Sequence, residues 1–594
     1  MAAPPAPPPV AQQQQEHDPA HPETTPRELR GWFAYDWANS AISSVAISGF
    51  LPLLLQETAL AAGGFPGACG NYVSNATLAA LAFPGAPLPG LYAYNDPDAA
   101  AYPPSARCGA VALLGGNGTW CPGAPPSAAE CLASTAGDVA ARVAISVTSA
   151  GRAWDPSAYA AAMVSVSTGV QMLVFVAVGG LADYGPWRKG LLTALSLAGA
   201  LFTVLCVTVT PANWWAGGLL LVLINVCYGA SYVVYNSYLP QLAASTPGVR
   251  HAPPGAARAA AYTAVIERIS SHGFAWGYTG SVLCLLVCVG ITAALSDDTI
   301  LAYRVNVLVS GVWWAAFGAL TLAWLRPRPG PPLPPGESYA LLPWKQLRRT
   351  LARAPQLPQT FGLLLCWFGY SDGFNVIASV GALYANSSVT WSFNKSLGLA
   401  GLLVIVPVFA AAGNVLFQWA SVRLRVQARA LIAFNCVCIA LVPAYGLLGY
   451  AHRSLGYRRW WELYLAVMWY GLHLGSVQSF SRALYGRMIP RGLEAQFYAL
   501  FSLTDRGSSW IGPAVVAAVI QASGGSLRLA FAYPLVALTV PCACLLLVDP
   551  SRGEADARAY AERHGTAPPH PLDAAPPAKA QPELVAAAAA PDAA

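Results

Sequence analysis

The stretch GGLADYGPWRK, residues 179–189, lies between two apolar runs that are each long enough to cross a bilayer. Its Gly-Pro turn and its two adjacent cations, Arg188 and Lys189, must therefore lie just outside the membrane. Lys and Arg in short loops mark the cytoplasmic side. The stretch consequently predicts a cytoplasmic loop, and this placement orients the spans on either side of it.

The composition of the chain is that of a polytopic membrane protein. Of its 594 residues, 55% are hydrophobic and only 10% are charged, which is more apolar surface than a soluble core of this length could bury. The cations lie in short loops instead of on one basic face, so nucleic-acid binding is not indicated. The first 28 residues lack the apolar core of a cleavable signal peptide, so we expect the first span to direct insertion.

Twelve segments are candidates for transmembrane helices, since a span needs about 20 mainly apolar residues. The predicted spans are 30–57, 158–182, 190–210, 214–238, 262–295, 301–325, 358–384, 397–420, 427–449, 460–486, 496–521 and 528–548. An even number of spans puts both chain ends on one side. Most loop cations also fall on that side, so both termini are predicted to be cytoplasmic. Arg453, Arg458 and Arg459 lie in one opposite loop and are outnumbered.

Glycosylation sequons and cysteines support the same orientation. Four sequons fall in loops that the charge rule places outside the cytoplasm, and they begin at Asn75, Asn117, Asn386 and Asn394. Four cysteines lie in the long first outer loop, where an oxidising compartment allows two disulfides: Cys69, Cys108, Cys121 and Cys131. Their pairing stays open. The remaining cysteines lie within spans as small apolar side chains, so no metal site is expected.

A Pro-rich, basic segment divides the spans into six and six. We therefore predict a disordered cytoplasmic tail at 1–28, a six-helix bundle at 29–326 with a lumenal loop at 58–157, a cytoplasmic linker at 327–357, a second six-helix bundle at 358–549 and a disordered cytoplasmic tail at 550–594.

The two halves repeat each other at three places. The first and seventh spans both contain Asp-x-x-Asn, as Asp36 to Asn39 and Asp372 to Asn375. Tyr, four residues and Pro end the fourth span at 235–240 and recur at 485–490. The third repeat is acid-Arg-x-Ser-Ser, at 267–271 and 505–509. Transporters commonly place a binding site between such internal repeats.

Charged side chains inside spans cost a few kcal/mol each, so we expect those of the repeats to face an interior cavity or one another. The candidate substrate or proton pathway comprises Asp36, Asn39, Asp372, Asn375, Tyr35, Tyr370 and Asn236. The two aspartates are interpreted as partners of an ammonium group or a proton, and Asn39 and Asn375 as hydrogen-bonding groups.

A second set of charges lies near the predicted cytoplasmic helix ends. The gate candidates are Asp183, Arg188, Lys189, Glu267, Arg268, Asp505 and Arg506. We expect Asp183 to pair with Arg506 across the two bundles, with contact to substrate as the alternative role of the two acid–arginine pairs. His473 is interpreted as a hydrogen-bonded packing residue.

Several motifs carry a family resemblance. The stretch at 179–189 resembles the loop between helices two and three of the major facilitator superfamily. GWFAYDWANS at 31–40, SSHGFAWGYTG at 270–280, SRALYGRMIP at 481–490 and SSWIGP at 508–513 resemble the autophagy-related vacuolar amino-acid effluxers of fungi. The resemblance implies an all-α, major-facilitator-type bundle of twelve transmembrane helices in the vacuole membrane. It further implies efflux of amino acids such as leucine, isoleucine and tyrosine from the vacuole to the cytosol after autophagic degradation.

The residues suit that cargo, because a zwitterion needs an anion for its ammonium and a cation or helix end for its carboxylate. A proton-coupled carrier of another small solute, such as a sugar or nucleoside, is the alternative. The chain lacks HExxH and Walker motifs, so an enzyme is not predicted. A sensor without transport activity is a third class. No cofactor is expected, with proton coupling left open, and the expected partners are a small-molecule substrate and the lipid bilayer. The oligomeric state stays open.

Overall fold

The computed structural model describes residues 22–62, 147–149, 152–154, 156–295, 298–387, 389, 391–392, 395–451, 456–509, 511–523 and 527–566. In this part of the chain the regular secondary structure consists of helices and one short antiparallel pair of strands, β1 (Val147–Ser149) and β2 (Arg152–Trp154). The predicted sequons at Asn75, Asn117 and Asn394 and the four loop cysteines lie outside the described residues. Asn386 lies in the last turn of α15 (Pro358–Ser387).

The N-terminal half begins with a helix whose middle is π-helical. Its elements are α1 (Pro26–Ala41), η1 (Ile42–Phe50), α2 (Leu51–Ala62), α8 (Pro156–Ala182), α9 (Trp187–Leu205), η4 (Cys206–Thr208), η5 (Pro211–Asn213), α10 (Trp214–Ala244), α11 (Pro247–Arg250), α12 (Ala256–Ala294) and α13 (Thr299–Trp324). The turn between α8 and α9 contains Gly185 at φ +67°, a left-handed conformation that glycine adopts without steric cost. This turn is the loop predicted from residues 179–189.

The linker and the C-terminal half follow. Their elements are α14 (Leu342–Ala352), η6 (Ala354–Gln356), α15, α16 (Lys395–Leu424), α17 (Ala428–Ala451), α18 (Trp460–Arg487), α19 (Glu494–Ser508), α20 (Ile511–Ala522), η7 (Leu529–Phe531), α21 (Ala532–Leu545) and α22 (Pro550–His564). The predicted eleventh span is therefore interrupted, with α19 ending before residue 510 and α20 starting after it.

Nine helical segments of the described chain are long and apolar enough to cross a membrane, and they coincide with the first nine predicted spans. The other three predicted spans are helical but fail this test individually. Within α18 lie Glu462, His473 and Arg482, while α21 has only 14 residues. The segment Leu529–Leu545 passes only together with α22, which is bent from it by 70°. Twelve spans therefore stay a prediction.

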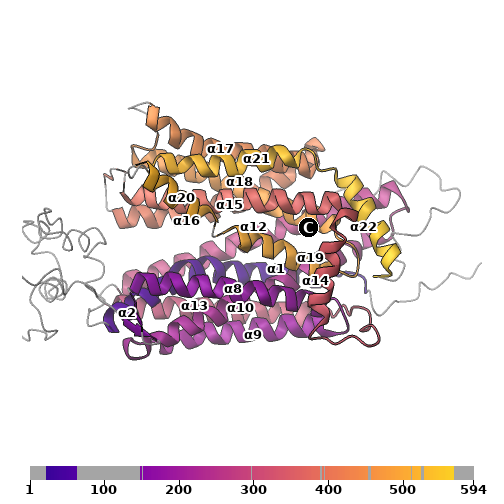
Figure 1. Cartoon of the computed structure of the whole chain (residues 1–594), viewed down its shortest axis with the longest axis horizontal. Coiled ribbons are helices and arrows are strands. Elements are labelled where there is room, and N and C mark those ends of the chain that lie inside the picture. The colour runs from indigo at the N-terminus through magenta and orange to yellow at the C-terminus, as the bar shows by residue number, and fades with distance from the viewer. Residues whose placement is uncertain are drawn as a thin grey trace, which may run out of the picture.

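The two halves form two bundles that lie side by side (Figure 1). In the N-terminal bundle α1 packs on α12 and α13, and α10 packs on α8 and α9. In the C-terminal bundle α18 packs on α16 and α17, and α15 packs on α21. Between the bundles, α12 contacts α16 and α18, while α19 contacts α8 and α10. The seam is therefore formed by helices α8, α10 and α12 on one side and α16, α18 and α19 on the other.

Both described chain ends lie at one end of the bundles, which we call the tail end. The backbone amide of Thr24 donates to Ser245 after α10, and the hydroxyl of Thr566 donates to the carbonyl of Arg491 after α18. Helices α14 and α22 lie at the same end, and α2 lies at the opposite end (Figure 1). An even number of crossings requires this arrangement. That the tail end faces the cytoplasm stays a prediction from the charge rule.

More of the two predicted tails is structured than expected. Thr24 and Glu28 are buried, and Glu28 pairs with the equally buried Arg328 of the linker at 3.1 Å. The segment from residue 550 forms α22, with Asp549 capping its N-terminus and Pro550 in its first turn. Gly553, Ala557 and Tyr560 make one buried stripe at helical spacing. Disorder was therefore the wrong prediction for residues 550–564, because this stripe packs the helix against the bundle.

Candidate functional site

A buried ion pair joins the two bundles at the seam. Asp36 of α1 accepts hydrogen bonds from Arg482 of α18 at 3.3 and 3.4 Å, and the two side chains are 4% and 1% exposed. Because desolvation of two charges often exceeds their attraction, a buried pair is weak evidence for a purely stabilising role. Its position between the halves makes it the leading candidate for the substrate site.

Arg482 is the hub of this site. Its remaining donors reach the hydroxyl and the carbonyl oxygen of Ser270 at 3.0 and 2.9 Å and the amide oxygen of Asn236 at 3.3 Å. The guanidinium also lies 5.0 Å from the ring of Trp32 and 4.2 Å from that of Phe274, within the range of cation–π attraction. These guanidinium contacts all come from the N-terminal half, so this arginine couples the C-terminal bundle to the predicted pathway.

Space for this pair depends on a glycine of α12. A Cβ atom at Gly273 would lie 2.3 Å from Oδ2 of Asp36 and 2.6 Å from the Trp32 ring. Neither group can withdraw easily, because Asp36 is held by Arg482 and Trp32 is stacked on Tyr235 at 4.6 Å. The glycine in the motif SSHGFAWGYTG therefore allows α12 to approach α1 closely.

The second predicted aspartate has different surroundings. Asp372 of α15 is buried and accepts a hydrogen bond from the hydroxyl of Tyr533 of α21, and its other oxygen has no hydrogen-bond partner in the described residues. A Cβ atom at Gly512 of α20 would meet this carboxylate within 3 Å. These neighbours all belong to the C-terminal half. Asp372 is thus enclosed as predicted, yet it contributes no described polar contact across the seam.

The other pathway candidates are also placed differently in the two halves. Asn39 is buried with its amide oxygen unpaired in the described part, whereas Asn375 is exposed. Tyr35 is fully buried, stacks on Tyr235 at 4.5 Å and shares a hydrogen bond with Ser196. The hydroxyl of Tyr370 lies 2.8 Å from that of Ser481, which precedes Arg482 in α18. Both predicted tyrosines therefore pack inside their own bundles.

A latch at the tail end contains two of the predicted gate residues. Asp183 accepts hydrogen bonds at 2.8 Å from the backbone amides of Ala495 and Gln496 in the first turn of α19, and Arg188 donates to it at 3.1 Å. Free amides and the helix dipole make a helix N-terminus a favourable site for a carboxylate. A Cβ atom at Gly179 would lie 2.6 Å from Ala499, so this glycine permits α8 to approach α19.

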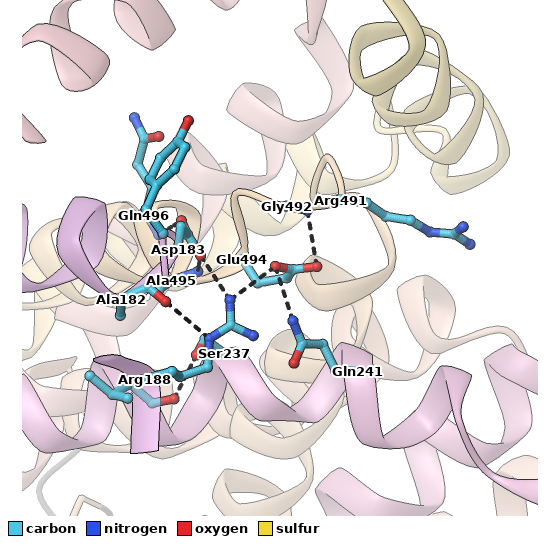
Figure 2. A network of polar contacts seen from close by, with 12 residues as sticks. Ala182, Asp183, Arg188, Ser237, Gln241, Arg491, Gly492, Glu494, Ala495 and Gln496 are labelled. Carbon is cyan, nitrogen blue, oxygen red and sulfur yellow. Dashed lines mark hydrogen bonds and ion pairs between the residues drawn. The ribbon is translucent and has the colours of Figure 1, made fainter. Parts of the chain in front are cut away.

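Glu494 completes the latch, as Figure 2 shows. It lies 3.5 Å from Arg188 and 3.4 Å from the amide of Gln241 on α10, and Arg188 also donates to the carbonyl of Ala182. Burial raises the pKa of Asp183 to about 7 and the nearby Glu494 adds to the rise, while Arg188 and the two backbone amides oppose it. The latch joins α8, α9 and α10 to α19 across the seam.

The predicted pair of Asp183 with Arg506 is wrong. The N-terminus of α19 lies at the tail end, so Arg506 lies eleven residues further along from Ala495, or about 16 Å at the α-helical rise. Asp505 and Arg506 are half-buried in the last turn of α19 instead of at the helix entrance. The error came from treating this pair as the cytoplasmic end of its span.

A second set of ion pairs includes one of the two charged gate candidates on α12. Glu267 pairs with Arg487 of α18 at 3.2 Å, and Arg487 also pairs with Glu554 of α22 at 2.6 Å. Arg268 is exposed and Lys189 is half-buried, and their parts in the gate stay predictions.

Three participating cations and acids were absent from the predicted sites: Arg482, Arg487 and Glu494. Arg482 could have been found, because it lies inside the predicted span 460–486, where an arginine is costly. Glu494 gave no comparable signal, because it precedes the apolar segment by only two residues.

Polar contacts across the seam extend from the tail end to the middle of the described structure. The last one along α12 joins the hydroxyl of Tyr278 to Gln478 of α18. The two short segments α2 and α20, which lie further from the tail end, each pack within their own half. The described polar contacts across the seam are therefore concentrated toward the tail end.

A family model supports the same reading along nearly the whole chain. The model described as "Vacuole effluxer Atg22 like" matches residues 24–558. The chain belongs to this family. Autophagy-related protein 22-1 of Aspergillus niger is 30% identical over 90% of this chain and 90% of its own length. Autophagy-related protein 22 of Yarrowia lipolytica is 30% identical over 90% of this chain and 98% of its own, and that of Coccidioides immitis is 29% identical over 91% and 89%.

Solved structures of transporters overlap with the Atg22-like chain more weakly. The Escherichia coli fucose:proton symporter aligns at a TM-score of 0.49 and 12% identity over 66% of this chain and 91% of its own. The proton:xylose symporter XylE aligns at 0.49 and 11% over 88% and 99%. Scores below 0.5 leave the assignment to rest on the family model and the fungal relatives. As an Atg22 family member, the chain is a transporter of the vacuole membrane with multiple spans, and not an enzyme.

Proposed function

We propose that the protein exports amino acids such as leucine, isoleucine and tyrosine from the vacuole lumen to the cytosol after autophagic degradation, by alternating access. The observation that carries this proposal is the pair of Asp36 and Arg482 at the seam. A free amino acid carries one positive and one negative group next to each other, and this pair offers one partner for each.

Substrate binding would replace the ion pair between Asp36 and Arg482 with two ion pairs to the substrate. The substrate ammonium would take the place of the guanidinium on Asp36, and the substrate carboxylate would take the place of Asp36 on Arg482, with Asn236 and Ser270 as further polar neighbours. Both protein charges stay paired throughout, which avoids the several kcal/mol that an unpaired buried charge costs. The same exchange separates α1 from α18 and thereby links binding to movement of the bundles.

Access from the end opposite the tail end fits the described conformation. The Asp183 latch and the Glu267–Arg487 pair hold the tail end together. Release of substrate at the tail end then requires both to break, while new contacts form elsewhere along the seam. This order of events supports efflux toward the side that the loop charges indicate as cytoplasmic.

Flux into and out of liposomes containing the purified full-length protein tests the proposal. Labelled leucine, isoleucine and tyrosine should be transported, and Asp36→Asn should abolish this flux without preventing insertion. Arg552→Gln on the exposed face of α22 serves as the matched control and should leave flux unchanged. Transport of labelled glucose or a nucleoside in place of every amino acid would assign the site to the alternative class of carrier. Repeating the flux with and without a pH gradient decides whether protons are coupled.

A further inference from the structure

The linker helix α14 has two faces of different character. Pro343, Gln346 and Thr350 are buried at helical spacing, and Leu342 is buried beside them. On the opposite face Leu341, Trp344 and Leu351 are 58%, 43% and 51% exposed. With Arg348 between them, these residues form one stripe along successive turns, which we call the outer stripe of α14.

Basic side chains surround the outer stripe. Residues 337–353 contain four cations, Lys345, Arg348, Arg349 and Arg353, against the single carboxylate of Glu337. Glu337 pairs with Lys345 at 2.8 Å and with Arg349 at 3.2 Å, so its charge is already matched on this surface. The segment therefore combines exposed Leu and Trp with a net positive charge. This combination is typical of helices that lie in the interface of an anionic membrane.

The position of α14 fits such a role. The helix runs across the tail end of the bundles instead of along them, and it lies beside α19 (Figure 1). It connects two bundles of membrane-spanning helices at their tail end, where such bundles meet the lipid headgroup region. Trp is enriched at this depth, Leu contributes to the apolar face of interfacial helices, and cations near them are attracted to negatively charged lipid.

The buried face of α14 touches the latch. A Cβ atom at Gly180 would lie 2.6 Å from Pro343, Gln346 donates to the hydroxyl of Tyr184 at 2.7 Å, and Thr350 is joined to the side chain of Gln496 at 2.8 Å. Tyr184 follows Asp183 in the sequence, and Gln496 supplies one of the two backbone amides that donate hydrogen bonds to Asp183. One short helix thus bridges the α8–α9 turn and the first turn of α19.

We propose that the outer stripe of α14 docks on anionic phospholipid of the leaflet at the tail end, and that this contact stabilises the closed latch. Lipid binding holds α14 against the α8–α9 turn and α19, so separation of the bundles at the tail end requires α14 to leave either the lipid or the latch. The lipid is a regulator of access and not a transported substrate.

Hydrogen exchange of the full-length protein in nanodiscs tests this proposal without measuring transport. One set of discs contains phosphatidylcholine alone, and the other an equal mixture of phosphatidylcholine and phosphatidylserine. The backbone amides of α14 and those of Ala495 and Gln496 should exchange more slowly in the mixed discs, because the last two report the latch directly. Equal exchange in both kinds of disc would overturn the proposal.

Matched variants separate a specific contact from general charge effects. Arg348→Gln with Arg353→Gln should weaken the lipid-dependent protection, by about fivefold for each arginine removed near an anionic surface. Arg552→Gln with Arg558→Gln removes the same charge from exposed positions of α22 and should retain the protection. Equal loss in both double variants would overturn the assignment to α14. Protection that requires an added soluble protein instead of phosphatidylserine would assign the outer stripe to a protein partner and would also overturn it.

Discussion

The surroundings of Asp36 and Asp372 differ although the two residues occupy corresponding places in the repeat. Asp36 pairs across the seam with Arg482, whereas Asp372 bonds to Tyr533 inside its own half. The repeat itself explains the difference. Arg482 precedes Tyr485 by three residues, and the residue three before Tyr235 is Tyr232. The N-terminal half therefore has a tyrosine where the C-terminal half has Arg482, and only one of the two acids can pair across the seam in this way.

This difference shows that duplication has fixed the places of the two acids and not their roles. One acid lies where movement of the bundles can break its contact, and the other lies where such movement leaves its neighbours in place. We therefore expect substitutions around Asp36 to act on transport and stability together, and those around Asp372 to act mainly on packing of the C-terminal bundle.

Arg482→Met tests the comparison most severely. It leaves Asp36 buried without a cation, so we expect unfolding free energy to fall by about 3–5 kcal/mol and amino-acid flux to be lost. Thermal unfolding in detergent and liposome flux measure both. The double variant Asp36→Asn, Arg482→Met removes the unpaired charge as well and should regain most of the stability but no flux. A stable, fully active Arg482→Met variant would end the distinction between the two acids.

Gly273→Ala sharpens the comparison from the side of α12. The added methyl group would contact Asp36 and Trp32 at distances that neither can relieve, so we expect a loss of about 1–3 kcal/mol from overpacking. Flux should fall together with stability, because the methyl group separates α12 from the ion pair. Gly290→Ala, on the same helix with open space around the added atom, is the control and should behave as wild type.

Tyr533→Phe applies the smaller change to the other acid. It removes the hydrogen bond to Asp372 and leaves the ring in place, so the expected loss is about 1 kcal/mol. Flux should persist at a reduced level, since no contact across the seam is touched. Complete loss of flux with a normal unfolding temperature would contradict this and would give Asp372 a direct part in transport.

Glu337 gives the smallest expected effect, because its ion pairs are exposed at the surface instead of buried at the seam. Its hydrogen bond to Lys345, together with Arg349, lowers the pKa of this carboxyl. A lowered pKa in the folded state contributes stability above the ordinary pKa of glutamate, about 4.3, and this contribution is lost as the pH falls through the folded value. Glu337→Gln should therefore unfold at a slightly lower temperature than wild type at neutral pH and at the same temperature in strong acid.

The sequence was informative where one physical rule dominates. Hydropathy located the first nine spans, and the cost of charge in lipid correctly enclosed Asp36, Asp372 and Glu267. Pairing depends on which helix ends meet, and that requires three-dimensional packing. Asp183 was therefore given Arg506 as a partner, when the partners in the structure are Arg188 and two backbone amides that no side-chain pattern reveals. The buried face of α22 was hidden by its charged, Ala-rich composition.

Arg487 has two acidic partners that lie in different halves of the molecule. Glu267 lies on α12 of the N-terminal bundle, whereas Glu554 lies on α22, which packs against Met488 beside Arg487. In the proposed opening of the tail end, Glu554 would stay with Arg487 and keep this cation neutralised. This contact would reduce the difference in free energy between the closed and the opened tail end, so that α22 would help to keep both conformations populated.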